Sequence, residues 1–226
     1  AAVGASLAVA GGVAQAVTRN PLADPYLLGV SSGAGFGVVV LTVLGWGAGV
    51  AGVFTLPVAA FVGSLLPLLG VVLVARRAND TTAIVLVGAA MTMVFGALNT
   101  FTLLVLGDDH QLGTVMRWLA GGFGDAGWTM LWAPLTILLV VGTVVLLFGR
   151  HLDLLLTGDD GATAMGVNVP RFRVLMLLLV SLLTAGAVAV SGTIGFIGLL
   201  IPHLAGFLTG RTSVRLLPTA ALLGAI

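Results

Sequence analysis

The sequence predicts an all-α protein, a polytopic bundle of transmembrane helices. Of its 226 residues, 59% are hydrophobic and only 8% are charged, whereas soluble domains carry about 25% charged residues. Several apolar stretches are close to the length of about 20 residues that a helix needs to cross a bilayer. The positively charged residues are all arginines, and most of them fall on one side of these stretches. Together these observations predict a single transmembrane domain over residues 1–226.

Seven apolar stretches and the beginning of an eighth follow one another along the chain. The first, sixth and seventh are shorter than a typical span, so we expect them to be tilted or partly interfacial. The stretches are Ala2–Val17, Leu27–Leu44, Val50–Val74, Thr82–Leu106, Trp128–Phe148, Val174–Val190, Ile194–Leu208 and a last one that begins at Leu216.

The arginines predict the orientation of these stretches. When the polar breaks alternate across the membrane, one side receives only Arg117, together with Asp108, Asp109 and Asp125. The other eight arginines share the opposite side, which the positive-inside rule makes cytoplasmic. They are Arg19, Arg76, Arg77, Arg150, Arg171, Arg173, Arg211 and Arg215. Ala1 then lies outside without a recognisable signal peptide, so we expect an internal fragment that lacks the first span and the C-terminal spans of a longer protein.

The polar stretch His151–Arg173, predicted to be cytoplasmic, is more elaborate than a connection between two spans requires. Thr157 or Asp159 can cap a helix, because a short side-chain oxygen accepts the free N–H groups of a first turn. Gly166 suits a left-handed helix stop, and Asn168 can cap the next helix. We therefore expect a short helix, a turn and the start of a long helix, exposed to a partner.

Gly29, Gly33 and Gly37 recur every four residues. On a helix they would form a small-residue face that lets another helix approach closely. A nucleotide-binding glycine loop is the alternative, but no strand precedes the motif and the chain has no lysine, which a Walker-type loop requires. The residues therefore favour helix packing.

The segment Gly192–Gly206 places Gly195 and Gly198 ahead of Pro202 and His203. This spacing predicts irregular backbone or a short helix, which is tolerated at membrane depth only where protein or a water-filled cavity surrounds it. The segment is thus predicted to be the wall of a pathway or a tight dimer contact. His203 could be a ligand or a proton carrier, although its position near the cytoplasmic end favours a structural hydrogen bond or a helix cap.

Side chains that carry catalytic or proton-coupled chemistry are scarce. The chain has no cysteine, which excludes disulfides, thiolate metal sites and thiol nucleophiles. Asp108–His110 is a run of metal-capable side chains, but adjacent residues rarely converge on one ion, so a solvated loop is favoured over a metal site. The apolar stretches contain almost no ionisable residue, whereas proton-coupled carriers need them. We therefore expect no enzymatic activity in this chain and an energy source in another subunit.

The outer break carries tryptophans as an interfacial belt would, at Trp118, Trp128 and Trp132. Its segment Met116–Trp128 can form a short helix on the outer surface. That helix would serve either as a membrane anchor or as a docking surface for an external protein.

Four stretches together resemble the FecCD-type permeases, the BtuC-like membrane subunits of bacterial type II ABC importers for ferric siderophores, haem and vitamin B12. They occur in the family's order and at its spacing, and they cover essentially the whole chain. The stretches are Arg19–Gly35, Met116–Gly124, Thr157–Val167 and Gly192–Gly206.

The resemblance implies a subunit with ten spans in the full-length family, of which about seven to eight are present here. It implies a homodimer in the bacterial inner membrane, two cytoplasmic ATPase subunits that bind ATP and magnesium, and an external substrate-binding protein. It implies no cofactor, metal or nucleic acid for this chain. The implied function is import of a ferric siderophore, or of haem or cobalamin, by alternating access.

Site residues follow from the same resemblance. The cytoplasmic gate corresponds to Asn20, Leu22, Thr81 and Thr82. The ATPase-coupling segment corresponds to Thr157, Gly158, Asp159, Asp160, Ala162, Met165 and Gly166. Binding-protein docking corresponds to Arg117, Trp118 and Asp125. The pathway or helix-packing set is Gly29, Gly33, Gly37, Gly195, Gly198, Pro202 and His203.

The chain departs from the family pattern at three positions. Asp159 stands where a glutamate is common, Gly206 where an arginine is common, and Thr212 where an acid is common. An ion-driven carrier or channel without an ATPase remains an alternative, but it predicts buried charged residues. A membrane enzyme is a second alternative, and it predicts a clustered polar site.

Overall fold

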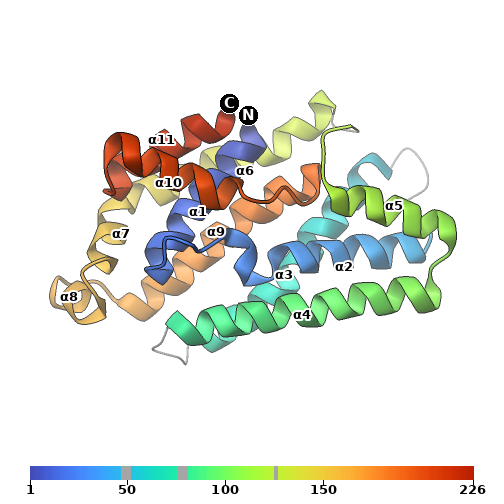
Figure 1. The fold of residues 1–226 in the computed structure, drawn as a ribbon, viewed down its shortest axis with the longest axis horizontal. Coiled ribbons are helices and arrows are strands. Elements are labelled where there is room, and N and C mark those ends of the chain that lie inside the picture. The colour runs from blue at the N-terminus through green and yellow to red at the C-terminus, as the bar shows by residue number, and fades with distance from the viewer. Residues whose placement is uncertain (47–51, 76–80, 125–126) are drawn as a thin grey trace.

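The computed structural model describes residues 1–46, 52–75, 81–124 and 127–226. Over these ranges every regular element is a helix (Figure 1), which confirms the all-α prediction. Asp125, Arg76 and Arg77 lie outside the described residues. The elements are α1 (Ala2–Thr18), the 3₁₀ helix η1 (Pro25–Leu28), α2 (Val30–Val43), α3 (Gly52–Ala75), α4 (Thr81–Leu106), α5 (Asp109–Ala120), α6 (Trp128–Leu147), α7 (Gly149–Leu155), α8 (Asp159–Ala164), α9 (Val169–Ser191), α10 (Ile197–Thr209) and α11 (Ser213–Ala225).

Four of these helices, α3, α4, α6 and α9, are long and apolar enough to cross a membrane by length and composition. The apolar helices α1, α2, α10 and α11 are shorter, at 13 to 17 residues. The prediction that the sixth stretch is short is wrong, because α9 spans 23 residues from Val169. The Asn168 side chain accepts a hydrogen bond from the Arg171 N–H at 3.3 Å. This cap lets the helix begin before its apolar part.

The second predicted stretch is divided into two helices. Gly29 lies between η1 and α2 with φ 76°, a left-handed conformation that glycine adopts without steric cost. The four-residue spacing had predicted one helical face for Gly29, Gly33 and Gly37. This prediction is wrong for Gly29, which lies before the first residue of α2. The carboxylate of Asp24 begins η1 by accepting the Tyr26 N–H at 2.8 Å.

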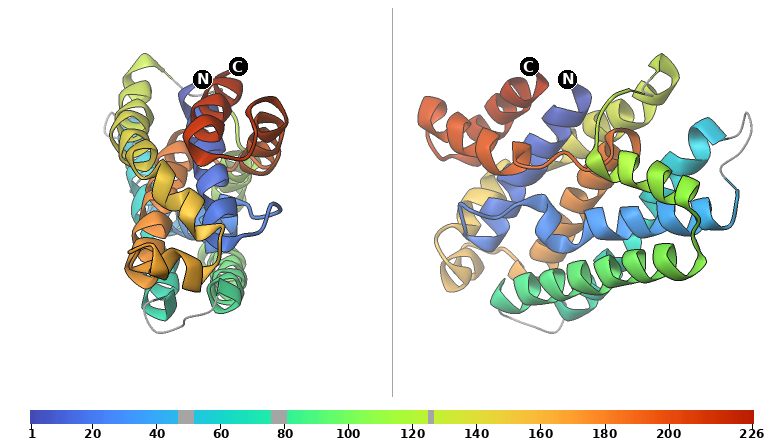
Figure 2. Two further views of the ribbon diagram at one scale, coloured as in Figure 1. Left: turned by 90° about the vertical axis from the view of Figure 1, so that its left-hand side faces the viewer. Right: turned by 45° about the vertical axis from the view of Figure 1, so that its right-hand side comes forward.

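The short helix α1 runs through the middle of the bundle and contacts α6, α9, α10 and α11. Nearly all of its residues are buried, and α9 beside it is also mostly buried. The helices α2, α3 and α4 pack side by side (Figures 1 and 2), with α4 at one edge of the molecule. Only 17% of the residues in the apolar stretch of α4 are buried. This helix therefore presents most of its surface outward.

The two ends of the bundle differ in character. The short helix α8 and the end of α1 lie at one end, on the left of Figure 1, whereas α5 lies at the opposite end. Arg19 and Arg173 meet at the α8 end. This arrangement agrees with the separation of the arginines in the sequence, which assigned that end to the cytoplasm.

Candidate functional site

The N-cap of α8 is Gly158, not Thr157 or Asp159 as predicted. Gly158 has φ 98°, and no side chain caps the first turn. The Thr157 hydroxyl instead donates to the Leu154 carbonyl oxygen at 2.8 Å. The positive φ requires glycine here, which is why the cap comes from backbone geometry and not from the neighbouring polar side chains.

The carboxylate of Asp159 joins α8 to two other helices. Its Oδ1 atom lies 2.8 Å from Nη2 of Arg19, which follows α1. The Nη2 atom of Arg173, on α9, donates to both carboxylate oxygens, at 3.0 Å and 3.2 Å. Asp159 thus faces the chain's own arginines, whereas the sequence interpretation grouped it with the surface that meets the ATPase.

Burial makes the two pairs unequal. The Arg173 side chain is only 3% exposed, whereas those of Arg19 and Asp159 are 35% and 32% exposed. A buried guanidinium needs a partner, because an unpaired buried charge costs several kcal/mol, on the order of 3–5. An exposed pair contributes only about 0.2–1 kcal/mol. Asp159 is therefore required by Arg173 and held more loosely by Arg19.

The remaining residues of α8 divide between the bundle and the surface. Ala162 is fully buried, so it anchors α8 and is not itself a contact surface for a partner. Burial of one such methyl group contributes only about 0.8 kcal/mol. Asp160, Met165 and Gly166 are exposed on the other side. Thr163 is exposed as well, so the outward surface of this segment is short and carries one acid, one hydroxyl and one flexible apolar side chain.

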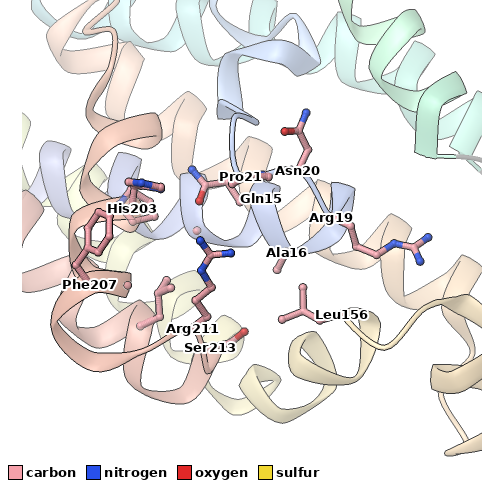
Figure 3. A pocket seen from close by; sticks show the side chains of 14 residues that line it. Gln15, Ala16, Arg19, Asn20, Pro21, Leu156, His203, Phe207, Arg211 and Ser213 are labelled. Atoms are coloured by element: carbon pink, nitrogen blue, oxygen red, sulfur yellow. The ribbon is translucent and has the colours of Figure 1, made fainter.

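The position of Arg19 depends on an uncommon backbone conformation. Its φ of 51° and ψ of 34° are left-handed, and its N–H donates to the Ala16 carbonyl as α1 ends. For a residue with a Cβ this conformation costs roughly 1–2 kcal/mol. The conformation turns the chain out of α1 and aims the guanidinium at α8. In Figure 3 the side chain points away from the other labelled groups.

The segment after Arg19 contains two of the predicted gate residues. Asn20 closes a tight turn through its Oδ1 atom, which accepts the Leu22 N–H at 2.9 Å. The Leu22 side chain is 72% exposed. Burial raises the pKa of the nearby Asp24 carboxyl, and the hydrogen bond from Tyr26 opposes this shift.

The other predicted gate residues begin α4. Thr81 is its first residue, and Thr82 next to it is exposed. Further along, α4 approaches η1 closely at Gly88. A Cβ added to Gly88 would overlap the Leu27 carbonyl oxygen. Backbone contact thus connects α4 with the segment that follows Asn20 and Leu22.

Tyr26 connects η1 to the backbone at Ile194, a contact that the sequence did not predict. Its hydroxyl donates to the Ile194 carbonyl at 3.0 Å and accepts from the Ile194 N–H at 3.2 Å. Beside it, a Cβ on Gly198 would lie 2.6 Å from Cδ of Pro25. The only signal in the sequence was that Tyr26 is the single tyrosine of the chain.

The same irregular segment, residues 192–196, also contacts the end of α5. The Thr193 hydroxyl donates to the Leu119 carbonyl, and the Gly122 N–H donates to the Ser191 carbonyl at 2.7 Å. Residues 192–196 therefore join the end of α5 to Tyr26 and the start of η1. Gly195 lies in this segment, and a Cβ added to it would meet no atom within 4 Å.

Two glycines of α2, Gly33 and Gly37, lie against α3. A Cβ on Gly37 would overlap the Ala59 carbonyl oxygen, and one on Gly33 would lie 2.6 Å from the Gly63 carbonyl oxygen. Gly63 on α3 is equally crowded by the backbone of α2. The two helices therefore approach so closely that a side chain larger than hydrogen fits at neither place.

A cavity of about 310 Å³ lies between the end of α1, α10 and α11 (Figure 3). It brings Asn20 together with Pro202 and His203, which the sequence had assigned to a different motif. His203 lies inside α10 with its ring 4.9 Å from that of Phe207. It is exposed and does not cap a helix, which corrects the expectation for this residue.

The predicted docking residues lie on α5 or outside the described ranges. Arg117 is exposed, and its guanidinium donates to the Thr114 hydroxyl at 3.3 Å. Trp118 packs partly against the core beside Val115 and is less exposed to a partner than Arg117. The acid that the sequence assigned to a solvated loop, Asp108, in fact begins α5. Its carboxylate accepts the Gln111 N–H at 2.7 Å in a capping box.

The long apolar helices and the polar ends described above are those of a polytopic membrane protein. The FecCD transport family model matches residues 1–226, and the chain belongs to this family.

Curated relatives match nearly the whole chain. It is 41% identical to the uncharacterized ABC transporter permease protein YvrB of Bacillus subtilis (strain 168), over all of this chain and 64% of that protein. It is 39% identical to the Fe(3+) dicitrate transport system permease protein FecC of Escherichia coli (strain K12), over 99% and 67%. It is 40% identical to the hemin transport system permease protein HmuU of Yersinia pestis, again over 99% and 67%. The chain thus spans about two thirds of the length of these relatives.

A solved structure has the same fold. An inward-facing conformation of a putative metal-chelate type ABC transporter superposes with a TM-score of 0.91 and 31% identity. The match covers 99% of this chain and 70% of that one. This similarity confirms the predicted permease fold.

Proposed function

We propose that this chain is the membrane-spanning part of an ATP-driven importer that moves its substrate by alternating access. The observation that carries the proposal is the exposed side of α8, which the Arg19–Asp159 ion pair holds beside the segment that begins at Asn20. Family membership supplies the class of transporter. In this proposal two ATPase subunits bind the exposed residues of α8, and the chain itself hydrolyses nothing.

The ATPase contact is tested with a matched pair of variants. Met165 follows α8 and Met116 lies on α5 at the opposite end, and both are 50% exposed. In the complete permease, Met165→Asp is expected to abolish co-purification of the ATPase subunits, whereas Met116→Asp leaves it intact. Equal loss in both variants would contradict the assignment, because it would reflect general damage. Transport that proceeds without any ATPase would favour the ion-driven alternative.

We propose a ferric siderophore as the substrate. Support comes from the similarity to FecC, whose name specifies an iron chelate, while HmuU is named for haem. The test is uptake into proteoliposomes with the cognate binding protein and labelled ferric siderophore, haem or cobalamin. Uptake of haem or cobalamin alone would overturn the siderophore assignment and leave the importer class intact.

We propose that two copies assemble through the outward face of α4, in the bacterial inner membrane. Large apolar side chains on that face are strongly exposed, with Met93 at 75%, Phe101 at 62% and Leu104 at 74%. A transported chelate is large, and a pathway between two copies accommodates it better than one inside a single small bundle. The chain has no cysteine, so a cysteine introduced at Phe101 should cross-link to its copy. A cysteine at Leu139, 60% exposed on α6, should not.

We propose that the binding protein docks on the outer end near α5, with Arg117 as a contact. The test is the affinity of the binding protein for the permease in nanodiscs. Arg117→Glu should weaken it, whereas Arg150→Glu, at the opposite end, should not. Unchanged affinity for Arg117→Glu would refute the contact.

A further inference from the structure

We propose that Asp159 is a positioning residue through which movement of α8 reaches the gate segment Arg19–Pro25. The inference rests on the proposed function, since it assumes that an ATPase moves α8. It adds a specific connection, made by one carboxylate between two arginines that come from different helices.

The two arginines hold this carboxylate in different ways. The buried Arg173 on α9 engages both carboxylate oxygens and is nearly inaccessible. Arg19 engages one oxygen through one nitrogen and is about one-third exposed. Water competes for the exposed pair and not for the buried one. The Arg173 contact therefore anchors α8, while the Arg19 contact is the one that can break and reform.

The exposed contact leads directly into the gate segment. Arg19 is followed at once by Asn20, whose side chain closes the turn at Leu22. The left-handed backbone of Arg19 sets the direction in which the chain leaves α1. A pull on the Arg19 guanidinium therefore acts on the residue at which this turn begins.

Among the described residues, the Arg19–Asp159 pair is the side-chain hydrogen bond that joins α8 to the end of α1. Of the residues in α8, only Ala162 is buried. The helix is six residues long, so it has few other groups through which to transmit a displacement. A second polar connection at this end, from the Asp153 carboxylate to the Ser213 N–H at 2.6 Å, joins α7 to α11 and bypasses α1.

Arg19→Gly is the decisive variant. Glycine keeps the left-handed backbone at no steric cost, so the variant removes the guanidinium without disturbing the turn. In the complete importer with its ATPase and binding protein, assembly should be retained. Substrate moved per ATP hydrolysed should fall by at least about fivefold, the lower end of typical coupling between sites.

Conservative variants and a matched control separate a coupling role from a structural one. Arg19→Lys and Asp159→Glu retain the charges, so each should keep the substrate moved per ATP at the level of the unmodified importer. Asp159→Asn removes the charge and should lower the substrate moved per ATP. Asp153→Asn removes a carboxylate at the same end but keeps an oxygen acceptor for Ser213. It should match the unmodified importer.

A reporter at Leu22 tests the movement itself. The Leu22 side chain is exposed and the chain has no cysteine, so Leu22→Cys would introduce a single thiol that can be labelled. Its labelling rate should change between the ATP-free and ATP-bound importer, and Arg19→Gly should abolish that change. A merely structural role for Arg19 would leave the ATP-dependent change in place.

The outcomes distinguish this inference from the proposed function. Unchanged transport per ATP in Arg19→Gly, or equal losses in Arg19→Gly and Arg19→Lys, would overturn the coupling role of this ion pair. Loss of ATPase binding in Arg19→Gly would also overturn it, by placing Arg19 in the subunit interface. Failure of the unmodified permease to bind an ATPase would instead refute the proposed function.

Discussion

Replacement of Tyr26 by phenylalanine tests whether one hydroxyl holds the irregular segment 192–196 in place. In the structure this hydroxyl serves both polar groups of Ile194, at 3.0 Å and 3.2 Å. Phenylalanine keeps the ring and its packing but removes both hydrogen bonds. The Ile194 N–H and carbonyl would then lose their partner in a part-buried place.

The cost of this change follows from the two groups left unpaired. A buried polar group without a partner costs about 1–3 kcal/mol, and hydrogen bonds between membrane helices average about 0.6 kcal/mol. Since Tyr26 is only partly buried, we expect a loss of about 1–2 kcal/mol for the two bonds together. In a chain of about this size, each kcal/mol lowers the melting temperature by about 2–4 °C.

The measurement is thermal unfolding of the complete permease in nanodiscs or mild detergent. The expected result is a melting temperature lower by about 2–8 °C. Thr143→Val is the control, because the Thr143 hydroxyl is exposed and only bonds back to Leu139 in its own helix. A Tyr26→Phe protein that melts within about 1 °C of the original would show that the hydroxyl does not hold the segment.

Three further variants test the backbone approach and the helix caps. Gly37→Ala should destabilise the permease by about 1–3 kcal/mol, because the added methyl would overlap the Ala59 carbonyl oxygen. Asp108→Ala should cost about 0.5–2 kcal/mol and raise proteolysis of α5, because the Gln111 N–H loses its acceptor. Gly29→Ala should cost about 1 kcal/mol or more, because φ is 76° and a side chain with Cβ is strained there.

Two of these variants, Gly37→Ala and Asp108→Ala, have a matched control in the same chain. Gly142→Ala in α6 meets only an ordinary contact, 3.6 Å from the Leu138 side chain, and should be neutral or slightly stabilising. Asp109→Ala beside the α5 cap should leave proteolysis unchanged, since Asp108 makes the capping bond. If Gly37→Ala and Gly142→Ala melt alike, the close approach of α2 and α3 is not important for stability. If Asp108→Ala and Asp109→Ala are cleaved alike, the capping box does not protect α5.

Local signals predicted several elements correctly. Asn168 caps α9 and Gly166 adopts φ 89°, as short-range backbone chemistry suggested. The same kind of reasoning failed at Thr157 and Asp159, where Gly158 is the cap. A cap depends on backbone dihedrals and on competing partners. The competing partners of Asp159 are arginines, one of them 140 positions away in the sequence.

The sequence by itself determined the class of protein. An 8% share of charged residues and long apolar stretches leave a bilayer as the environment in which this chain can fold. The distribution of the arginines predicted which end is cytoplasmic, because the arginine bias of short loops sets the orientation of the spans. Family motifs placed the chain in the FecCD transport family, which the family match confirms.

Only the tertiary structure decided which polar groups meet. The Arg19–Asp159 contact and the Tyr26–Ile194 contact join residues 140 and 168 positions apart. No periodicity in the sequence identifies such pairs, because they depend on how helices cross and on which side chains remain without water. Patterns along the chain predict where helices form and which of them enter the membrane. The packing of those helices decides that a single carboxylate lies between two of them.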